Sequence, residues 1–233
     1  MSPISNKGKG TLVYLSGMSL GQEFLGIERL GEWEVVMPVW LEPEENEPLT
    51  AYARRMARTI KPWNPTYLAG VSFGGALVLE MIREMKVKGA CIVAGITNRA
   101  ELPWYFRIMR FVPAAVLRGL IDVAYFLATF INRWLGFLLS ENAKAFFKFF
   151  KKTKPSYVKW GIHALLNWTP NSAKVEIPVL RIHGNRDRIF KPLQYGPIAF
   201  VEGGGHALTA THSGEVNGLI YEFIWKHTQQ KSR

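Results

Sequence analysis

The segment Gly70-Val71-Ser72-Phe73-Gly74 is the most informative about the fold of this chain. It stands between a strand-like apolar run at 66–69 and a run at 76–85 whose apolar residues recur at helical spacing. Such a turn needs small residues two positions before and two after the serine, because only they let the backbone bend sharply. The bend presents the serine hydroxyl beside the N–H groups that begin the helix, where an anion is stabilised. The pattern therefore predicts a nucleophile elbow, with Ser72 as the nucleophile and Gly70 and Gly74 shaping the turn.

Two further motifs follow predicted strands nearer the C-terminus. Asp187 comes soon after an apolar run at 177–180, and His206 follows three glycines after a short strand at 197–200. Residues just past a strand lie at the edge where open α/β sheets carry their ligand sites. Taken alone, Asp187 is also typical of a turn or helix N-cap, and His206 of a surface loop. Together with Ser72 they stand in the chain order nucleophile, acid, base.

Two other residues are alternatives for the base and the acid. His212 lies beyond the glycine-rich loop, and Asp122 lies in the middle of a predicted helix. Neither follows the end of a strand, so we favour His206 and Asp187.

With these motifs the chain resembles the α/β-hydrolases, in particular small bacterial serine hydrolases and esterases with a helical cap. The motifs are Gly-Val-Ser-Phe-Gly-Gly at 70–75, His-Gly-Asn-Arg-Asp at 183–187 and Gly-Gly-Gly-His at 203–206. The resemblance covers residues 11–96 and 175–228. It implies Ser72 as the nucleophile, His206 as general base and then acid, and Asp187 as the group that orients the imidazole.

The resemblance also implies an oxyanion hole. The backbone N–H groups of Phe73 and Met18 would be its two donors. Many family members carry His-Gly after the preceding strand, whereas this chain has Ser16-Gly17. We expect Ser16 and Ser19 to serve simple turn chemistry.

Strand-like and helix-like segments alternate along most of the chain. Strands are predicted near 11–16, 34–40, 66–71, 89–95, 177–183 and 197–201, and helices near 22–30, 50–60, 74–85 and 214–228. This alternation predicts an α/β fold, a mostly parallel sheet of about six strands with helices on both faces. At 233 residues the chain is expected to form one hydrolase core from 1–96 and 175–233, with 97–174 inserted as an all-helical cap.

The insert carries most of the net charge. Residues 99–174 hold 12 Lys and Arg against three acidic residues, which accounts for nine of the chain's formal eleven positive charges. Within it, 113–139 is mostly apolar around one narrow polar stripe. The longest charge-free run, 123–132, is far shorter than the about 20 apolar residues that cross a bilayer. We expect the wide apolar face to cover an acyl pocket, to rest on the catalytic domain, or both.

Aromatic residues of the insert are candidates for a substrate pocket or for the core of the cap. They are Phe130, Trp134, Trp160 and Trp168, and His163 beside them is interpreted as structural. Phenylalanines alternate with lysines at 146–152. We favour a helix packed by its phenylalanines with solvated lysines. The alternative is contact with an anionic membrane surface.

Several features limit the class of protein. The only cysteine, Cys91, lies in an apolar strand, so no intrachain disulfide is expected. Residues 1–8 lack the apolar stretch of a signal peptide, which favours a cytoplasmic protein, with a peripheral membrane location as the alternative. We expect no metal, no cofactor and no nucleic-acid partner, since no motif for any of them is present.

The leading hypothesis is a serine-dependent carboxylic ester hydrolase with an apolar acyl substrate. A thioesterase, lipase, amidase or carbon–carbon bond hydrolase would use the same three residues, and the motifs do not separate them. A second hypothesis of another class is a non-catalytic lipid-binding or receptor-like protein that retains the hydrolase shell. Its support is the basic, aromatic insert.

Overall fold

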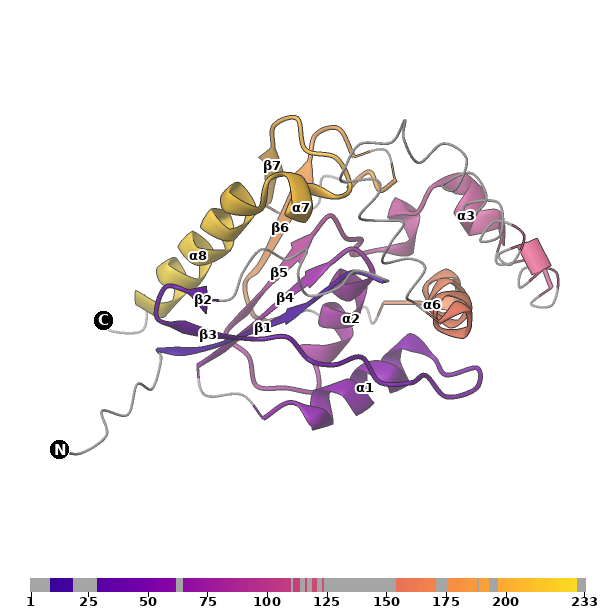
Figure 1. Ribbon diagram of the computed structural model, residues 1–233, viewed down its shortest axis with the longest axis horizontal. Helices are drawn as coiled ribbons and strands as arrows, with labels where there is room; N and C mark the ends of the chain where they lie inside the picture. Colours follow the sequence, from indigo (N-terminus) through magenta and orange to yellow (C-terminus); the bar gives the residue numbers. More distant parts are fainter. Residues whose placement is uncertain are drawn as a thin grey trace.

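A seven-stranded sheet forms the centre of the molecule, in the order β2-β3-β1-β4-β5-β6-β7 (Figure 1). The structure, a computed structural model, describes residues 9–18, 29–61, 65–109, 111–113, 116, 119–120, 123, 154–170, 176–187, 189–192 and 197–229. The strands are β1 (Gly10–Leu15), β2 (Arg29–Leu30), β3 (Trp33–Val36), β4 (Thr66–Val71), β5 (Gly89–Val93), β6 (Val179–Gly184) and β7 (Ile198–Val201). All neighbours pair in parallel except β2 and β3, which pair antiparallel.

The three central strands are buried along their whole length, because helices cover both faces of the sheet. Side chains alternate between these faces. Val13 and Leu15 of β1 join one apolar cluster, and Leu12 and Tyr14 join the other. The predicted mostly parallel sheet with helices on both faces is confirmed.

Each face is covered by helices whose apolar residues recur at helical spacing. The helices are α1 (Leu49–Thr59), α2 (Phe73–Met81), η2 (Arg99–Glu101), α3 (Trp104–Met109), α6 (Pro155–Asn167), α7 (Leu208–Thr211) and α8 (Ser213–Gln229). The cluster on one face includes α1, α2 and α6. On the other face α8 buries Val216, Ile220 and Ile224, which follow one another by four residues (Figure 1).

Two predicted elements differ from the structure. The helix predicted at 22–30 is wrong at its end, because 29–30 form the short strand β2, and 22–28 lie outside the described residues. The strand predicted at 34–40 ends at Val36, and the chain then runs on as a loop to α1. A strand of two residues is too short to show a period, which is why no pattern in the sequence indicated β2.

The predicted cap is described only at its two ends. After β5 come η2 and α3, residues 116, 119–120 and 123 are helical, and the chain is described again from 154, where α6 begins. Phe130, Trp134, Asp122 and the segment 146–152 lie outside the described residues, so their expected roles stay predictions. The division into a core and a cap at 97–174 also stays a prediction. Within the described ranges, no helix combines the length and the hydropathy that a bilayer-crossing segment needs.

Candidate active site

Ser72 occupies the turn between β4 and α2, and its backbone is strained. Its φ is 53° and its ψ is −116°, a left-handed conformation that residues other than glycine rarely adopt. Backbone hydrogen bonds hold it there: Ser72 N donates to Val93 O at 2.8 Å, and Gly75 N donates to Ser72 O at 2.9 Å. The turn therefore keeps the serine at the end of β4 and at the N-terminus of α2.

Both predicted elbow glycines are required by close backbone approach. A Cβ on Gly70 would collide with the carbonyl group of Gly74. A Cβ on Gly74 would lie 2.5 Å from the carbonyl oxygen of Ser16, in the loop after β1. The glycines thus let the elbow bend and let the loop at 16–18 pass directly beside the first turn of α2.

Three predicted side chains meet in one hydrogen-bonded chain at the carboxyl end of the sheet. Ser72 Oγ lies 2.9 Å from His206 Nε2, and His206 Nδ1 lies 2.9 Å from Asp187 Oδ2. Ser72 follows β4, Asp187 follows β6 and His206 follows β7. Parallel strands end at the same edge of the sheet, so residues far apart in sequence converge there. The Phe190 ring and the His206 imidazole pack at nearly right angles, with ring centroids 5.0 Å apart.

Asp187 is held in a place that favours its ionised form. Its Oδ1 accepts hydrogen bonds from Ile189 N at 2.8 Å and Phe190 N at 3.1 Å. Burial raises the pKa of the Asp187 carboxyl group, but the hydrogen bond and charge of His206 and the two amides outweigh it, so the pKa lies below its usual value. An ionised Asp187 takes the Nδ1–H of His206. That leaves Nε2 as the acceptor for the Ser72 hydroxyl group.

His183 is a buried residue beside the hydrogen-bonded series Ser72–His206–Asp187, and the sequence indicated no role for it. Its Nε2–H donates to Gly95 O at 2.8 Å, and its Nδ1 lies 3.9 Å from Asp187 Oδ2. Burial lowers the pKa of His183, which favours the neutral imidazole. His183 therefore ties the end of β6 to the segment after β5, and Gly95 of that segment lies close to the backbone of Ser72. The available signal was its place at the end of an apolar strand, where a buried imidazole needs a partner.

The predicted oxyanion donors lie beside the elbow. Phe73 is the first residue of α2, so its N–H is one of the four that a helix leaves without an intrahelical acceptor. Met18 ends the described part of the loop after β1. Ser16 in that loop does more than shape a turn, because its Oγ accepts a hydrogen bond from Trp40 Nε1 at 3.0 Å. The Trp40 ring also packs on Phe73, so one indole contacts both sides of the predicted hole.

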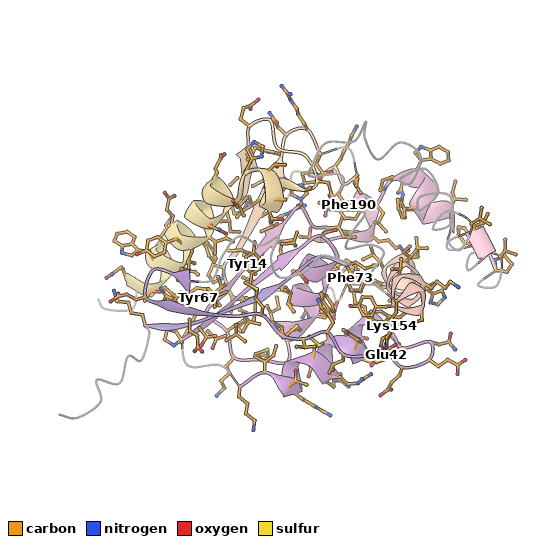
Figure 2. All side chains as sticks on the ribbon, in the orientation of Figure 1. Tyr14, Glu42, Tyr67, Phe73, Lys154 and Phe190 are labelled. Atoms are coloured by element: carbon orange, nitrogen blue, oxygen red, sulfur yellow. The ribbon has the colours of Figure 1, made fainter. Side chains whose placement is uncertain are left out.

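Helix α6 lies over this loop. A Cβ on Gly161 would be 2.5 Å from Met18 Cε and 3.7 Å from the Phe73 ring, so α6 passes close to both predicted donor residues. At the start of α6, Lys154 Nζ forms an ion pair with Glu42 Oε2 at 2.7 Å (Figure 2). The position of α6 is thus set by contacts with the catalytic face and with the loop before α1.

The two described tryptophans among the predicted pocket residues are both buried. Trp160 Nε1 donates to Glu47 O at 2.8 Å, and its ring packs on Tyr52 and Phe73. Trp168 Nε1 donates to Glu80 Oε1 at 2.7 Å, which anchors the end of α6 to α2. Trp160 therefore belongs to the aromatic cluster beside the nucleophile, whereas Trp168 has the geometry expected of a packing residue.

No metal centre is formed by the described part of the chain, in which no three His, Cys, Asp or Glu side chains gather as ligands. The alternative base His212 hydrogen-bonds to the adjacent Thr211 Oγ1 at 2.8 Å. The alternative acid Asp122 is not among the described residues.

Comparison with solved structures identifies the architecture. No protein-family model matches the sequence, and no curated protein matches it significantly. Structural matches include a hydrolase from Oleispira antarctica (15% identity, TM-score 0.71, covering 94% of this chain and 92% of the other). Others are MenH from S. aureus (14%, 0.70, 96% and 95%) and a thermophilic esterase from Thermogutta terrifontis (14%, 0.66, 93% and 90%). The chain therefore has the α/β-hydrolase fold.

Proposed function

We propose that the protein is a serine hydrolase that cleaves carboxylic esters with apolar acyl groups through an acyl-enzyme intermediate. The observation that carries the proposal is the chain Ser72 Oγ–His206 Nε2 and His206 Nδ1–Asp187 Oδ2, with 2.9 Å at each step. Structural neighbours described as esterases, hydrolases and a thioesterase domain support hydrolysis as the general reaction class.

In the first half of the reaction, Ser72 Oγ bonds to the ester carbonyl carbon while its proton passes to His206 Nε2. Asp187, which accepts the Nδ1–H, stabilises the imidazolium that forms. Negative charge gathers on the carbonyl oxygen, where the N–H groups of Phe73 and Met18 would receive it. The ester C–O bond then breaks, and the imidazolium gives its proton to the leaving alcohol.

In the second half, a water molecule attacks the acyl-serine. His206 takes a proton from the water as the water oxygen bonds to the acyl carbon. The bond between the acyl carbon and Ser72 Oγ then breaks, and His206 gives that proton to Ser72 Oγ. The products are a carboxylic acid and the free enzyme. The three side chains and the water account for every proton, so this route requires no further group.

An aromatic cluster supports the apolar acyl group. Phe73 directly follows the nucleophile, and its ring lies 5.9 Å from the Trp40 ring and 5.7 Å from the Trp160 ring. Tyr52 and Tyr157 extend the cluster. These buried and partly buried rings make the surroundings of the nucleophile apolar on the side of α6. Thioester cleavage uses the same catalytic groups, so a thioesterase is the alternative within this class.

The decisive experiment compares the native protein with Ser72→Ala on a series of p-nitrophenyl esters and acyl thioesters. We expect Ser72→Ala to lose about 10⁴–10⁶-fold in kcat/KM. The matched control is Ser156→Ala, which changes an exposed serine of α6 and retains the native rate. Equal rates for native protein and Ser72→Ala would contradict the proposal.

A fluorophosphonate probe separates an enzyme from a non-catalytic lipid-binding protein. The native protein should be labelled at Ser72, located by mass spectrometry of the peptide, and Ser72→Ala should not. A folded native protein that resists labelling would favour the non-catalytic alternative.

A further inference from the structure

We propose that the outward face of α3 and of the helical residues after it is a docking surface for an anionic phospholipid bilayer. The surface comprises the apolar residues Trp104, Ile108, Phe111, Val116, Leu120 and Val123, together with Arg99 and Arg107. We call it the α3 face. The proposal concerns binding and does not depend on the hydrolytic reaction.

The α3 face exposes an apolar stripe that a globular helix would normally bury. Trp104 and Ile108 lie four residues apart on one side of α3, and Phe111, in the turn after α3, lines the same hollow as both of them. Val116, Leu120 and Val123 follow one another by four and three residues. All six side chains are between 53% and 72% exposed. The expectation that the apolar face of 113–139 covers a pocket or packs on the catalytic domain stays a prediction, because most of that segment lies outside the described residues.

The stripe is a concentrated patch. Of the eleven large hydrophobic residues that are exposed in the described parts of the chain, six fall within 104–123. The other five are scattered from Val39 to Trp225. Trp104, Ile108 and Phe111 line one hollow and so lie close together in space, and an exposed apolar patch marks an interaction site.

The positive charge of the α3 face favours an anionic partner. A hollow of about 570 Å³ lies between η2, α3 and the segment after α6, and it is lined by Arg99, Arg107, Trp104, Ile108 and Phe111 among others. Residues 99–123 contain four arginines and two acidic residues, and one of these acids, Glu101, is buried in an ion pair with Arg181. A second copy of the chain would bring the same cationic face against this one, which disfavours a symmetric dimer. Large apolar side chains flanked by arginines are typical of helices at anionic membrane surfaces.

The α3 face is fixed to the body of the protein rather than carried on a loose segment. Glu101 Oε1 accepts a hydrogen bond from Arg181 Nη2 of β6 at 2.6 Å, and its Oε2 accepts one from Thr97 N at 2.6 Å. Both side chains of the Glu101–Arg181 pair are almost fully buried. This pair holds η2 against the sheet just before α3 begins, so the surface is presented in one orientation.

The α3 face also stands on the side of the molecule that carries Ser72. The segment leading to α3 leaves the carboxyl end of β5, the edge at which Ser72 follows β4 (Figure 1). α3 packs against α6, and α6 passes over Met18 and Phe73. A protein docked by this face would hold that edge of the sheet near the lipid.

The test is co-sedimentation of the full chain with vesicles of phosphatidylcholine alone or mixed with phosphatidylglycerol. We expect the native protein to bind the mixed vesicles and not the neutral ones. The triple variant W104S/I108S/F111S should bind at least about tenfold more weakly. The charge variant R99Q/R107Q should lose about tenfold or more on the mixed vesicles. The matched control V39S/F200S/W225S removes three exposed hydrophobic side chains elsewhere and should bind as the native protein does.

Each other outcome overturns the proposal. Native-like binding by W104S/I108S/F111S, with the 146–152 segment intact, would place the anchor elsewhere. Equal binding to neutral and anionic vesicles would remove the role of the arginines. Light scattering without lipid measures the oligomeric state. A native dimer that becomes a monomer in W104S/I108S/F111S would show that the α3 face binds a second copy of the chain instead of lipid. Thermal melting followed by circular dichroism checks that every variant is folded. The variant R99Q/R107Q tests the same surface while its apolar residues remain in place.

Discussion

The hydrogen bond from Trp40 Nε1 to Ser16 Oγ leads to a quantitative prediction about catalysis. Ser16 is buried and stands two residues before Met18, the predicted oxyanion donor. Trp40→Phe removes the N–H donor and leaves an aromatic ring to pack on Phe73. The loop at 16–18 would then lose the bond that fixes it, and the Met18 N–H would be less well aimed at the oxyanion.

The size of the effect lies between two limits. Leaving a buried hydroxyl without its partner costs about 1–3 kcal/mol. Complete loss of one oxyanion donor costs about 2.7–4 kcal/mol, which the variant should not reach because the loop remains in place. We therefore expect Trp40→Phe to lower kcat/KM by about 5- to 100-fold. The loss should fall on kcat, since the oxyanion exists only in the transition state.

The assay is steady-state hydrolysis of a p-nitrophenyl ester by Trp40→Phe, Ser16→Ala and the double variant. Both single variants break the same bond, so the double variant should lose little more than either one. Trp225→Phe, which changes an exposed tryptophan of α8, is the control and should retain the native kcat. An unchanged kcat in a folded Trp40→Phe protein, a rise in KM alone, or fully additive losses would refute this reasoning.

Three other predictions follow from the same contacts. Asp187→Asn should lower kcat by about 10⁴-fold, because an amide cannot hold His206 in the productive tautomer. His212→Gln should retain the native kcat, and the rate of ester hydrolysis is measured for both variants. Burial lowers the pKa of His183, so the unfolded chain binds more protons than the folded one just below about pH 6.5, and the free energy of unfolding should fall as the pH drops through that range. Urea denaturation across that range should show a weaker dependence in His183→Gln, and an identical dependence would count against this assignment. Glu101→Ala removes the carboxylate that pairs with the buried Arg181 and should lower the free energy of unfolding by about 3–5 kcal/mol. Glu84→Ala, in the exposed pair with Arg54, is the control and should lower it by less than about 1 kcal/mol. Urea denaturation compares the two variants, and equal losses would exclude a special role for the buried pair.

Much of the fold could be predicted because its signals are local. Parallel strands covered on both faces read as short apolar runs, and five of the six predicted strands lie within about two residues of those observed. The exception, 34–40, ends early because the chain past Val36 becomes a loop whose Trp40 turns toward Ser16. That contact depends on two segments meeting in space, which no period along the chain could indicate.

For the site residues, too, local signals could be predicted and contacts between distant segments could not. Gly70, Ser72 and Gly74 were predicted from a turn motif, and the structure shows the close approaches that require glycine there. Trp168 was a candidate for the substrate pocket or the core of the cap, and the structure shows its indole N–H donating to Glu80 of α2, while any role toward a substrate stays a prediction. Composition indicates that a tryptophan will be buried, and only the packing of α6 on α2 decides which side chains it meets.

The turn at Ser72, the alternation of strands and helices, and the concentration of positive charge in residues 99–174 could all be inferred from the sequence alone. Each of these depends on backbone sterics, side-chain periodicity or charge, which act within a few residues or do not depend on the fold. Two outcomes needed the folded structure: Ser72 and His206, 134 residues apart, come within 2.9 Å, and Trp104 and Ile108 of α3 are exposed. These outcomes depend on how the strands are ordered and how the helices pack, because contacts between distant segments are set by the whole sheet rather than by neighbours in the chain.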